Sequence, residues 1–383
     1  MVTIIRAAEG HAGIPVNFPI LLTEGMEIIE PAFEYLYEIA TLYGRTHSRE
    51  TLRTYAEHLY DWFDSLEQSD LSWRDVRTDT IAAYRNRMLE RPSAHTGRPY
   101  ARSTINDRVR TICRFYEWAH GRGWIDEHPI LYADLALTSL QSHGFLAHLG
   151  PRSITHANAL TLAEYESLPR PLRVDELQRL FSHLDMPYRL MAEWALATGM
   201  RRMELCAMAA RQVPDIGAID AASVPLIGVA LTVTKGARPR AVYPPVRLID
   251  RTHWYIGEDR AALVRKRKRG HGSYQPPLNL FLNCYGNPVT RARLTAVLRA
   301  AFDAAGVNGS LHWLRHTFAM TMLVRLQAQV VANPDINPLK ILQVLMGHSS
   351  IQTTSIYLRC VELHDSEIAE SLAYLYGDVI DGS

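Results

Sequence analysis

The chain has 383 residues, of which 47% are hydrophobic and 21% charged, and its formal net charge at pH 7 is +1. This length predicts two domains of ordinary size, and the composition is typical of a soluble globular protein. The sequence has no apolar run long enough for a membrane span, no secretory signal pattern and no CxxC pair among its four cysteines, so we expect a cytoplasmic protein without a zinc ribbon or a disulfide framework.

The first third of the sequence has the periodicity of amphipathic helices. Apolar residues recur at spacings of three and four within residues 48–66 and again within residues 101–125. Ser48 is a candidate N-cap of one helix, and Thr78 or Asp79 is a candidate N-cap of another. We therefore predict an all-helical domain with helices at residues 28–40, 48–66, 77–91 and 101–125.

One edge of this helical domain is basic. Eight arginines lie between residues 85 and 114, against only Glu90 and Asp107, and five consecutive basic residues follow at 265–269. A chain of nearly neutral net charge can still bind phosphates through such local positive charge. A solvated helix face has the same pattern, so charge alone leaves nucleic-acid binding open.

The middle of the chain is less regular. Residues 136–170 are interpreted as a linker or an extended hairpin, and a second domain is expected from residue 171. Within it, β-branched residues on both sides of a Lys235-Gly236 turn predict a β-hairpin over residues 225–245. Helices are predicted at residues 173–184, 188–199, 260–268, 290–305, 311–328, 338–346 and 351–357.

Arg201 follows a glycine turn in the stretch TGMR and lies in the first turn of the next predicted helix. An arginine in this place can project into a cleft. Glu204, three residues later, lies on the same helical face and could orient it. The alternative is an ordinary surface arginine at a joint between two helices.

His312 and Arg315 are three residues apart, so a helix places both on one face. An arginine can bind the oxygens of a phosphate in a fork while a histidine transfers a proton. Lys235 is one of only four lysines in the chain and, unlike arginine, can give up its proton when desolvated, which suits a general acid. The alternatives are an exposed helix face and a solvated turn.

The stretch LMGHSSIQTTSIYLRC places Tyr357 nine positions after His348. Taken alone, the stretch could hold a nucleophile and its hydrogen-bond partner, but a capped helix that carries a core tyrosine is the favoured interpretation. Ser349 and Ser350 are interpreted as capping and turn residues.

Five motifs occur in one order between Thr198 and Tyr357: TGMR-x-x-EL, TKG on a hairpin, HWLRHTFA, LMGHSS, and a tyrosine nine positions after that histidine. Together they strongly resemble the tyrosine recombinases, also called the phage integrase family. The resemblance implies a catalytic set of Arg201, Lys235, His312, Arg315, His348 and Tyr357, with Glu204 in support and no metal ligands.

The resemblance also implies a fold and a domain plan. The fold is mainly α with a small antiparallel β-sheet, in which a helical, SAM-like core-binding domain and a mixed α/β catalytic domain form a C-shaped clamp around DNA. The expected parts are a short extension at residues 1–24, a core-binding domain at 25–135, a linker at 136–170, a catalytic domain at 171–360, and a tail at 361–383 that could be exchanged between subunits.

The implied function is site-specific recombination. Tyr357 would attack a DNA phosphodiester and form a 3′-phosphotyrosyl intermediate, with His312 assisting proton transfer at the tyrosine, Lys235 protonating the leaving 5′ oxygen and no metal, ATP or other cofactor. The partners would be double-stranded DNA and a homotetramer on two sites, with or without a related recombinase, bound to the nucleoid in the cytoplasm. The alternatives are a type IB topoisomerase and a catalytically inactive DNA-binding protein of the same fold. The arginines expected to contact DNA are Arg85, Arg98, Arg102, Arg108, Arg110 and Arg114.

Overall fold

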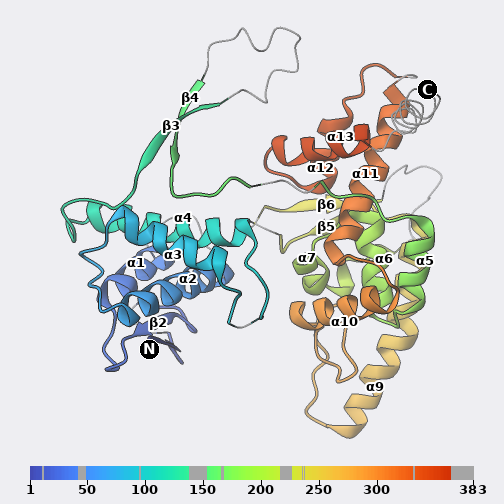
Figure 1. Ribbon diagram of the computed structural model, residues 1–383. Helices are drawn as coiled ribbons and strands as arrows, with labels where there is room; N and C mark the ends of the chain where they lie inside the picture. Colours follow the sequence, from blue (N-terminus) through green and yellow to red (C-terminus); the bar gives the residue numbers. More distant parts are fainter. Residues whose placement is uncertain are drawn as a thin grey trace, which may run out of the picture. The chain divides into compact units, whose positions relative to one another are not determined.

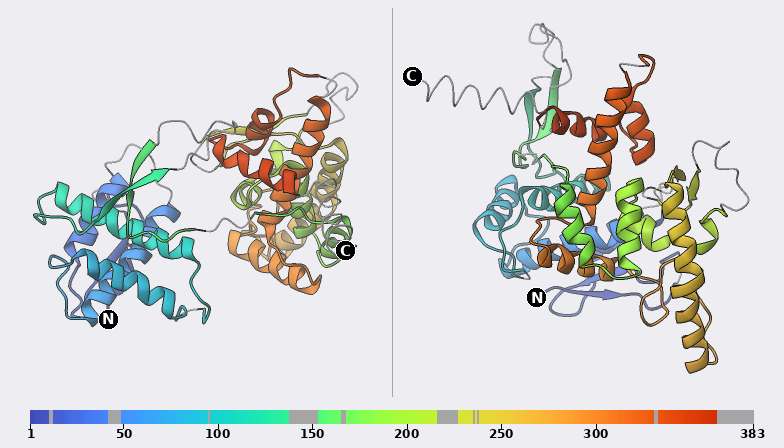
Figure 2. Two further views of the ribbon diagram at one scale, coloured as in Figure 1. Left: turned by 45° about the horizontal axis from the view of Figure 1, so that its top comes forward. Right: turned by 90° about the vertical axis from the view of Figure 1, so that its right-hand side faces the viewer.

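The computed structural model describes residues 1–10, 13–41, 49–94, 96–137, 153–164, 168–215, 227–234, 236, 238–330 and 333–363. The chain divides into two compact units, residues 1–166 and 167–383, and each is described by itself (Figures 1 and 2). Ser48, Lys235 and the tail from residue 364 lie outside the described residues. Within the described ranges, no helix is both long and apolar enough to cross a membrane.

The first unit is a bundle of helices with two small hairpins. The four predicted helices are confirmed, and each begins and ends within a few residues of the predicted bounds. N-cap prediction was less accurate, because Arg77 rather than Thr78 or Asp79 is the N-cap of α3. The elements are β1 (Thr3–Arg6), β2 (Pro19–Leu22), α1 (Glu30–Thr41), α2 (Arg49–Gln68), α3 (Thr78–Glu90), α4 (Arg102–Gly121), β3 (Tyr132–Leu137) and β4 (Ser153–Asn158).

An aromatic core holds this unit together. Trp62 of α2 and Phe115 and Tyr116 of α4 are buried, and their rings meet edge to face, the arrangement that aromatic quadrupoles favour. Val2 and Phe18 are buried in the same core. The described part of residues 1–24, predicted as a short extension, therefore packs with the helices of the first unit.

An antiparallel strand pair, β3 with β4, begins before residues 136–170 and extends into them, which agrees with the hairpin alternative for the described part of this segment. β3 pairs with β4 in a register that sets Tyr132 opposite Asn158. Asn106 of α4 donates a 2.9 Å hydrogen bond to the carbonyl of Leu162, which fixes the chain that leaves β4 against the bundle.

Over the residues that the structure describes, the second unit is mainly helical with one short hairpin, which confirms the predicted class of a mainly α fold with a small antiparallel sheet. Its elements are α5 (Val174–Ser182), α6 (Tyr188–Thr198), α7 (Arg202–Ala207), the 3-10 turn η2 (Ala210–Gln212), β5 (Val229–Leu231), β6 (Arg240–Val242), α8 (Val246–Tyr255), the π-helical segment η5 (Ile256–Arg260), α9 (Ala261–Gly270), α10 (Arg291–Ala304), α11 (Leu311–Val330), α12 (Pro338–Met346) and α13 (Gln352–Leu363).

Helix α11 is the centre of the second unit, because it packs against α6 on one side and against α12 and α13 on another (Figures 1 and 2). Met320 and Leu323 of α11 are buried together with Leu342 of α12 and with Tyr357 and Cys360 of α13. This apolar cluster brings the predicted nucleophile onto the helix that carries His312 and Arg315.

The predicted hairpin is confirmed, and its register fixes the direction of one side chain. Leu231 of β5 lies opposite Arg240 of β6, and Val229 lies opposite Val242. Because side chains two residues apart share one face of a strand, Arg240 lies on the same face as the buried Val242. The prediction missed α8, since the π-helical segment at residues 256–260 interrupts the helical period between α8 and α9.

Candidate active site

The first predicted arginine is positioned by a glycine-terminated helix. Gly199 ends α6 in the left-handed conformation, with φ 64°, and a Cβ there would lie 2.7 Å from the ring of Phe318. The chain turns sharply after it, so Arg201 becomes the N-cap of α7. Its backbone N–H donates to Glu204 Oε2 at 2.6 Å and its Nη1 to Glu204 Oε1 at 3.2 Å, as the sequence predicted for this pair.

Glu204 is bound by a second arginine that the sequence reasoning missed. Arg240 Nη2 lies 2.8 Å from Glu204 Oε2, and the two side chains are 8% and 0% exposed. Burial acts to raise the pKa of Glu204, but the hydrogen bond and charge of Arg240, with those of Arg201, outweigh it and hold the pKa below its ordinary value. The strand alternation of β6, with an arginine two residues before a buried valine, was the available signal.

Arg240 also reaches the ends of two helices. Its Nη1 donates to the carbonyl of Leu345 in α12 at 2.6 Å, and its Nη2 to the carbonyl of Gly199 at 3.5 Å. Gly347 ends α12 with φ 59°, and a Cβ at this position would overlap the Arg240 side chain. The guanidinium therefore joins the hairpin to the ends of α6 and α12.

Arg315 lies in the interior of this cluster, with 2% of its surface exposed. It donates to the carbonyls of Gly199 and Met346, the latter at 2.7 Å, and its Nη2 lies 3.1 Å from His348 Nε2. Burial, and then the charges of Arg201 and Arg240, lower its pKa to about 9, so the side chain remains a cation at neutral pH.

The contact with Arg315 defines the state of His348. Because a guanidinium can only donate, His348 Nε2 must accept, and Nδ1 then carries the proton that faces Thr354 Oγ1 at 2.9 Å. Burial, followed by the charges of Arg315 and Arg201, lowers the pKa of His348 to about 3. The imidazole is therefore neutral at physiological pH.

Tyr357 lies on α13 with 3% of its surface exposed. Its ring is stacked on His348, with the centroids 6.3 Å apart and the planes 9° from parallel. The phenol oxygen lies 3.0 Å from Nδ1 of His316. Burial raises the pKa of Tyr357 to about 12, although Arg315 acts in the opposite direction.

His316 was not among the predicted residues, and the expectation gave proton transfer at Tyr357 to His312. The two histidines are one helical turn apart on α11, with ring centroids 4.4 Å apart in an edge-to-face arrangement. His312 is exposed, while His316 is half-buried and lies against the phenol. Their spacing of four residues was the sequence signal that could have pointed to the second histidine.

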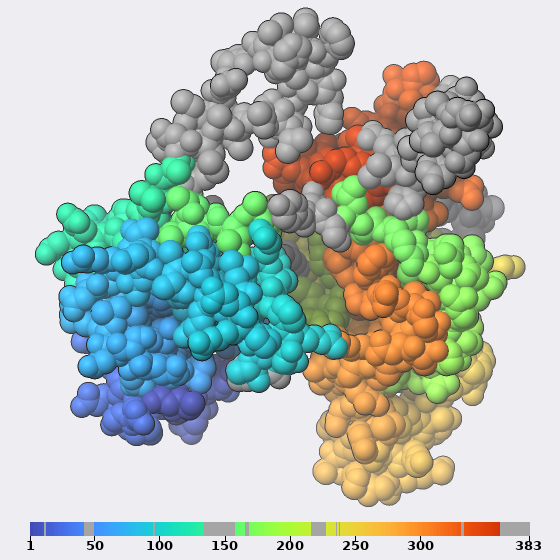
Figure 3. All heavy atoms as spheres, viewed as in Figure 1, coloured from blue at the N-terminus to red at the C-terminus, as the bar shows by residue number. Residues whose placement is uncertain are grey.

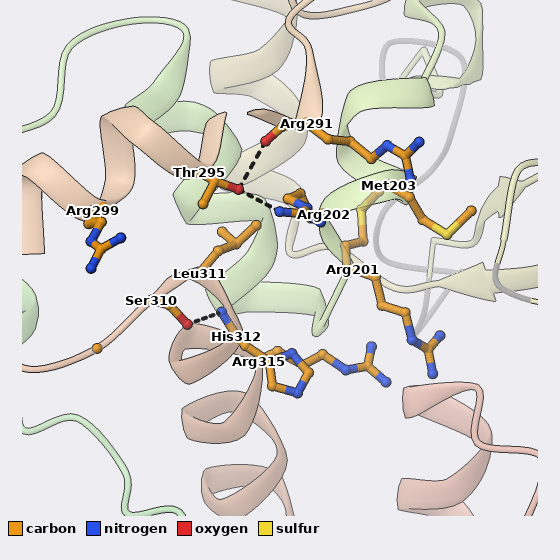
Figure 4. A pocket seen from close by; sticks show the side chains of 12 residues that line it. Arg201, Arg202, Met203, Arg291, Thr295, Arg299, Ser310, Leu311, His312 and Arg315 are labelled. Carbon is orange, nitrogen blue, oxygen red and sulfur yellow. Dashed lines mark hydrogen bonds between the residues drawn. The ribbon is translucent and has the colours of Figure 1, made fainter. Parts of the chain in front are cut away.

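A basic cavity opens beside these residues (Figure 4). Its volume is about 630 Å³, and its lining includes His312 and five arginines. Figure 4 shows Arg201 and Arg315 beside each other near His312, with Arg291, Thr295 and Arg299 contributed by α10. Such a cavity can bind a phosphate through its guanidinium groups. The lining arginines are Arg201, Arg202, Arg291, Arg299 and Arg315.

The arginines predicted to contact DNA in the first unit differ in their surroundings. Arg108 is only 17% exposed, forms an ion pair with Asp61 and lies over the ring of Tyr100. Through this pair with the half-buried carboxylate of Asp61, Arg108 contributes to the stability of the bundle, and its contact with DNA stays a prediction. Of the other predicted arginines, Arg85 is half-buried and the rest are exposed to solvent. Hydrogen bonds run from Arg85 to the carbonyl of Leu160, from Arg102 to the carbonyl of Ala163, from Arg110 to the carboxylate of Glu164 and from Arg114 to the hydroxyl of Tyr55.

The basic run at residues 265–269 forms the end of α9, which stands out from the rest of the second unit (Figure 3). Arg267 stacks on Tyr285, with its Cζ 5.5 Å from the ring centroid. The other four basic side chains of the run are exposed.

Comparison with known proteins finds two family profiles. The phage integrase family profile matches residues 170–363, and the profile for the phage integrase N-terminal SAM-like domain matches residues 37–123. Among curated proteins, the tyrosine recombinase XerC of Halalkalibacterium halodurans is 27% identical over 322 residues, which cover 82% of this chain and 88% of the relative. The tyrosine recombinase XerD of Mycobacterium leprae is 32% identical over 207 residues, which cover 50% of this chain and 56% of the relative.

Solved structures of the same fold are also found. A lambda integrase (75–356) dimer bound to a COC′ core site matches with a TM-score of 0.54 and 16% identity, over 88% of this chain and 96% of that one. The XerH site-specific recombinase bound to a palindromic difH substrate matches with a TM-score of 0.50 and 18% identity, over 89% of this chain and 82% of that one.

Proposed function

This chain belongs to the phage integrase family of site-specific tyrosine recombinases, and from that premise we propose that Tyr357 cuts and rejoins DNA through a 3′-phosphotyrosyl intermediate. The observation that carries the proposal is the position of the Tyr357 hydroxyl, 3.0 Å from an imidazole and in the same cluster as Arg315 and His348. A buried phenol with a neighbouring base is the arrangement that an activated nucleophile requires.

Arg201 and Arg315 bind the non-bridging oxygens of the scissile phosphate in this proposal. Both guanidinium groups already have fixed directions, since Arg201 is bound by Glu204 and Arg315 by the carbonyls at the ends of two helices. Charge develops on the phosphate oxygens as the tyrosine attacks, and preorganised donors stabilise that charge without reorganising. The neutral His348 donates one further hydrogen bond to the same phosphate once the DNA displaces its present partner.

The leaving 5′ oxygen takes a proton from Lys235 in the proposed reaction. Strands β5 and β6 of the same hairpin pair with each other, and Arg240 of β6 binds Glu204, the partner of Arg201, which supports a role for this hairpin in the site. The phosphotyrosyl bond keeps the energy of the phosphodiester, so rejoining needs no ATP, and the two arginines supply the positive charge that stabilises the phosphate oxygens.

The proposed partners are double-stranded DNA and further copies of this chain. Two related solved structures are a lambda integrase dimer on a core site and a lambda integrase tetramer bound to a Holliday junction. By analogy, four copies of this chain would exchange strands between two duplex sites. The protein would act at the nucleoid in the cytoplasm.

A nicked suicide substrate tests the enzyme proposal, because loss of a short 5′-hydroxyl fragment traps the covalent adduct. Wild-type protein should form an adduct that survives denaturing electrophoresis, and Tyr357→Phe should form none. Tyr255→Phe is the matched control, since Tyr255 is also buried in the second unit and also has a hydroxyl in a hydrogen bond. Absence of an adduct with wild type, or an undiminished adduct with Tyr357→Phe, would contradict the proposal.

A topoisomerase or an inactive binding protein would give different results in the same experiments. An inactive protein forms no adduct. A type IB topoisomerase forms one but, added to two sites on one plasmid, relaxes supercoils without exchanging the flanking segments.

A further inference from the structure

The proton of the attacking tyrosine needs an acceptor. We propose that His316, and not the exposed His312, is the catalytic base that takes the proton from Tyr357. The inference rests on the proposed function and assigns one further residue to it. It concerns only the second unit, in which both histidines and the tyrosine are described.

Geometry is the first argument. His316 Nδ1 lies 3.0 Å from the Tyr357 oxygen, which is within the reach of a general base. The two ring centroids are 5.6 Å apart, and the phenol is almost fully enclosed by the packing of α13 on α11. The tyrosine hydroxyl therefore has a base in contact before DNA arrives.

The two histidines face different parts of the site. His312 is exposed and lines the basic cavity with Arg201 and Arg315, where the phosphate is proposed to bind (Figure 4). His316, one turn later on α11, is directed inward at the nucleophile. His312 is thus placed to contact the phosphate or the leaving oxygen, and His316 to contact the attacking oxygen.

The surroundings of His316 keep its imidazole unprotonated before DNA binds. Burial, then the neighbouring His312 and Arg315, lower the pKa of His316 to about 4, so the ring is neutral at physiological pH. Nδ1 accepts from the phenol in the tautomer that carries its proton on Nε2. A phosphodiester in the cavity adds a negative charge that opposes the effect of Arg315 and raises the affinity of His316 for the proton.

Tyr357 needs a base because its raised pKa leaves the phenol protonated at neutral pH. With a pKa of about 12, only a fraction on the order of 10⁻⁵ to 10⁻⁴ of Tyr357 is ionised at pH 7.5. In the proposed step the Tyr357 oxygen forms a bond to phosphorus, its proton moves to His316 Nδ1, and the bond from phosphorus to the 5′ oxygen breaks. The 5′ oxygen takes a separate proton from the opposite side of the phosphate. Rejoining reverses each transfer, and His316 returns the proton to the phenol.

Single-turnover cleavage of the nicked substrate tests this assignment. His316→Gln keeps a polar side chain of similar size but cannot take up a proton, so cleavage should slow by about 10²- to 10⁴-fold while the Kd for DNA stays unchanged. Its rate should also rise about tenfold per pH unit between pH 7 and 9.5, because hydroxide must now remove the proton. Wild-type protein should show no such slope.

A substrate with a 5′-bridging sulfur distinguishes deprotonation of Tyr357 from protonation of the leaving group, because a thiolate leaves without being protonated. The slow cleavage of His316→Gln should persist on this substrate, whereas a variant that lacks the leaving-group acid should recover. Recovery of His316→Gln would place His316 on the leaving oxygen and overturn the proposal.

Chemical rescue keeps the test independent of folding defects. His316→Ala leaves space for a small base, so added imidazole should restore cleavage in proportion to its concentration. A folded, DNA-binding variant that cleaves within threefold of wild type, or that stays slow without a changed pH profile and without rescue, would overturn the role of His316. If wild-type protein itself forms no adduct, the proposed function fails instead.

Discussion

Replacement of Arg240 by methionine tests the cluster that positions Arg201. The change removes a cation that is 8% exposed and leaves Glu204, which is 0% exposed, with Arg201 as its remaining partner. It also removes the donor to the carbonyl of Leu345. Methionine keeps most of the apolar stem, so the effect reports on the guanidinium contacts rather than on a cavity.

The contacts of Arg240 give an expected size for the loss of unfolding free energy in Arg240→Met. Removing one partner of a buried ion pair costs about 3–5 kcal/mol, because the remaining charge is left without compensation. Glu204 retains Arg201 and a backbone N–H, so we expect the low end, about 3 kcal/mol of unfolding free energy. A displacement of Arg201 by about 1 Å would also slow DNA cleavage by about 100-fold.

Urea unfolding followed by circular dichroism measures the loss of unfolding free energy, and the nicked suicide substrate measures the rate of DNA cleavage. Arg53→Met is the matched control, since Arg53 pairs with Glu57 at the surface and should contribute less than about 1 kcal/mol. A double-mutant cycle of Arg240→Met with Glu204→Gln should give a coupling energy above about 1 kcal/mol. Additive effects, or an Arg240→Met variant as stable as the Arg53→Met control, would refute this account of the cluster.

Three further predictions follow from other residues. Gly347→Ala should cost about 2 kcal/mol in urea unfolding, from a left-handed φ of 59° and an overlap with a neighbouring side chain, whereas Gly306→Ala, with φ 64° but open space, should lose only about 1 kcal/mol. Since the pKa of His348 is lowered to about 3, the folded protein binds fewer protons than the unfolded chain below pH 6.5, so stability should fall as the pH drops from 6.5 toward 3 and His348→Gln should show a shallower fall in the same titration. Arg108→Gln should lower unfolding free energy by about 2 kcal/mol through loss of a half-buried pair, whereas Arg102→Gln should leave stability unchanged and reduce the slope of log Kd against log salt by about 0.9 in DNA-binding titrations.

The features of this protein that depend on neighbouring residues along the chain could be predicted from the sequence. The 3.6-residue period located α2 and α4, and the glycine turn before Arg201 located the start of α7. The pairing of Arg201 with Glu204 followed from a spacing of three residues on one helix. In each case the residues that interact are neighbours along the chain, so a helix or a turn is enough to bring them together.

The parts that depend on distant contacts could not be predicted. Arg240 meets Leu345, 105 positions away, and His316 meets Tyr357, 41 positions away. The sequence around Arg240 and the sequence around His316 do not indicate which distant residue the tertiary packing brings into contact. Similarly, Val2 and Phe18 look like an unattached terminus until the bundle that buries them is known. The role of Lys235 stays a prediction.

The two glycine-terminated helices have a consequence for how the site behaves without DNA. Helices α6 and α12 end at Gly199 and Gly347, and their last carbonyls accept hydrogen bonds from Arg315 and Arg240. The carboxyl end of a helix has a partial charge of about −0.5, so the two ends together offset about one elementary charge of the cluster. The fold thus supplies part of the counter-charge for the buried guanidinium groups of Arg315 and Arg240, which lowers the electrostatic cost of burying them before DNA binds.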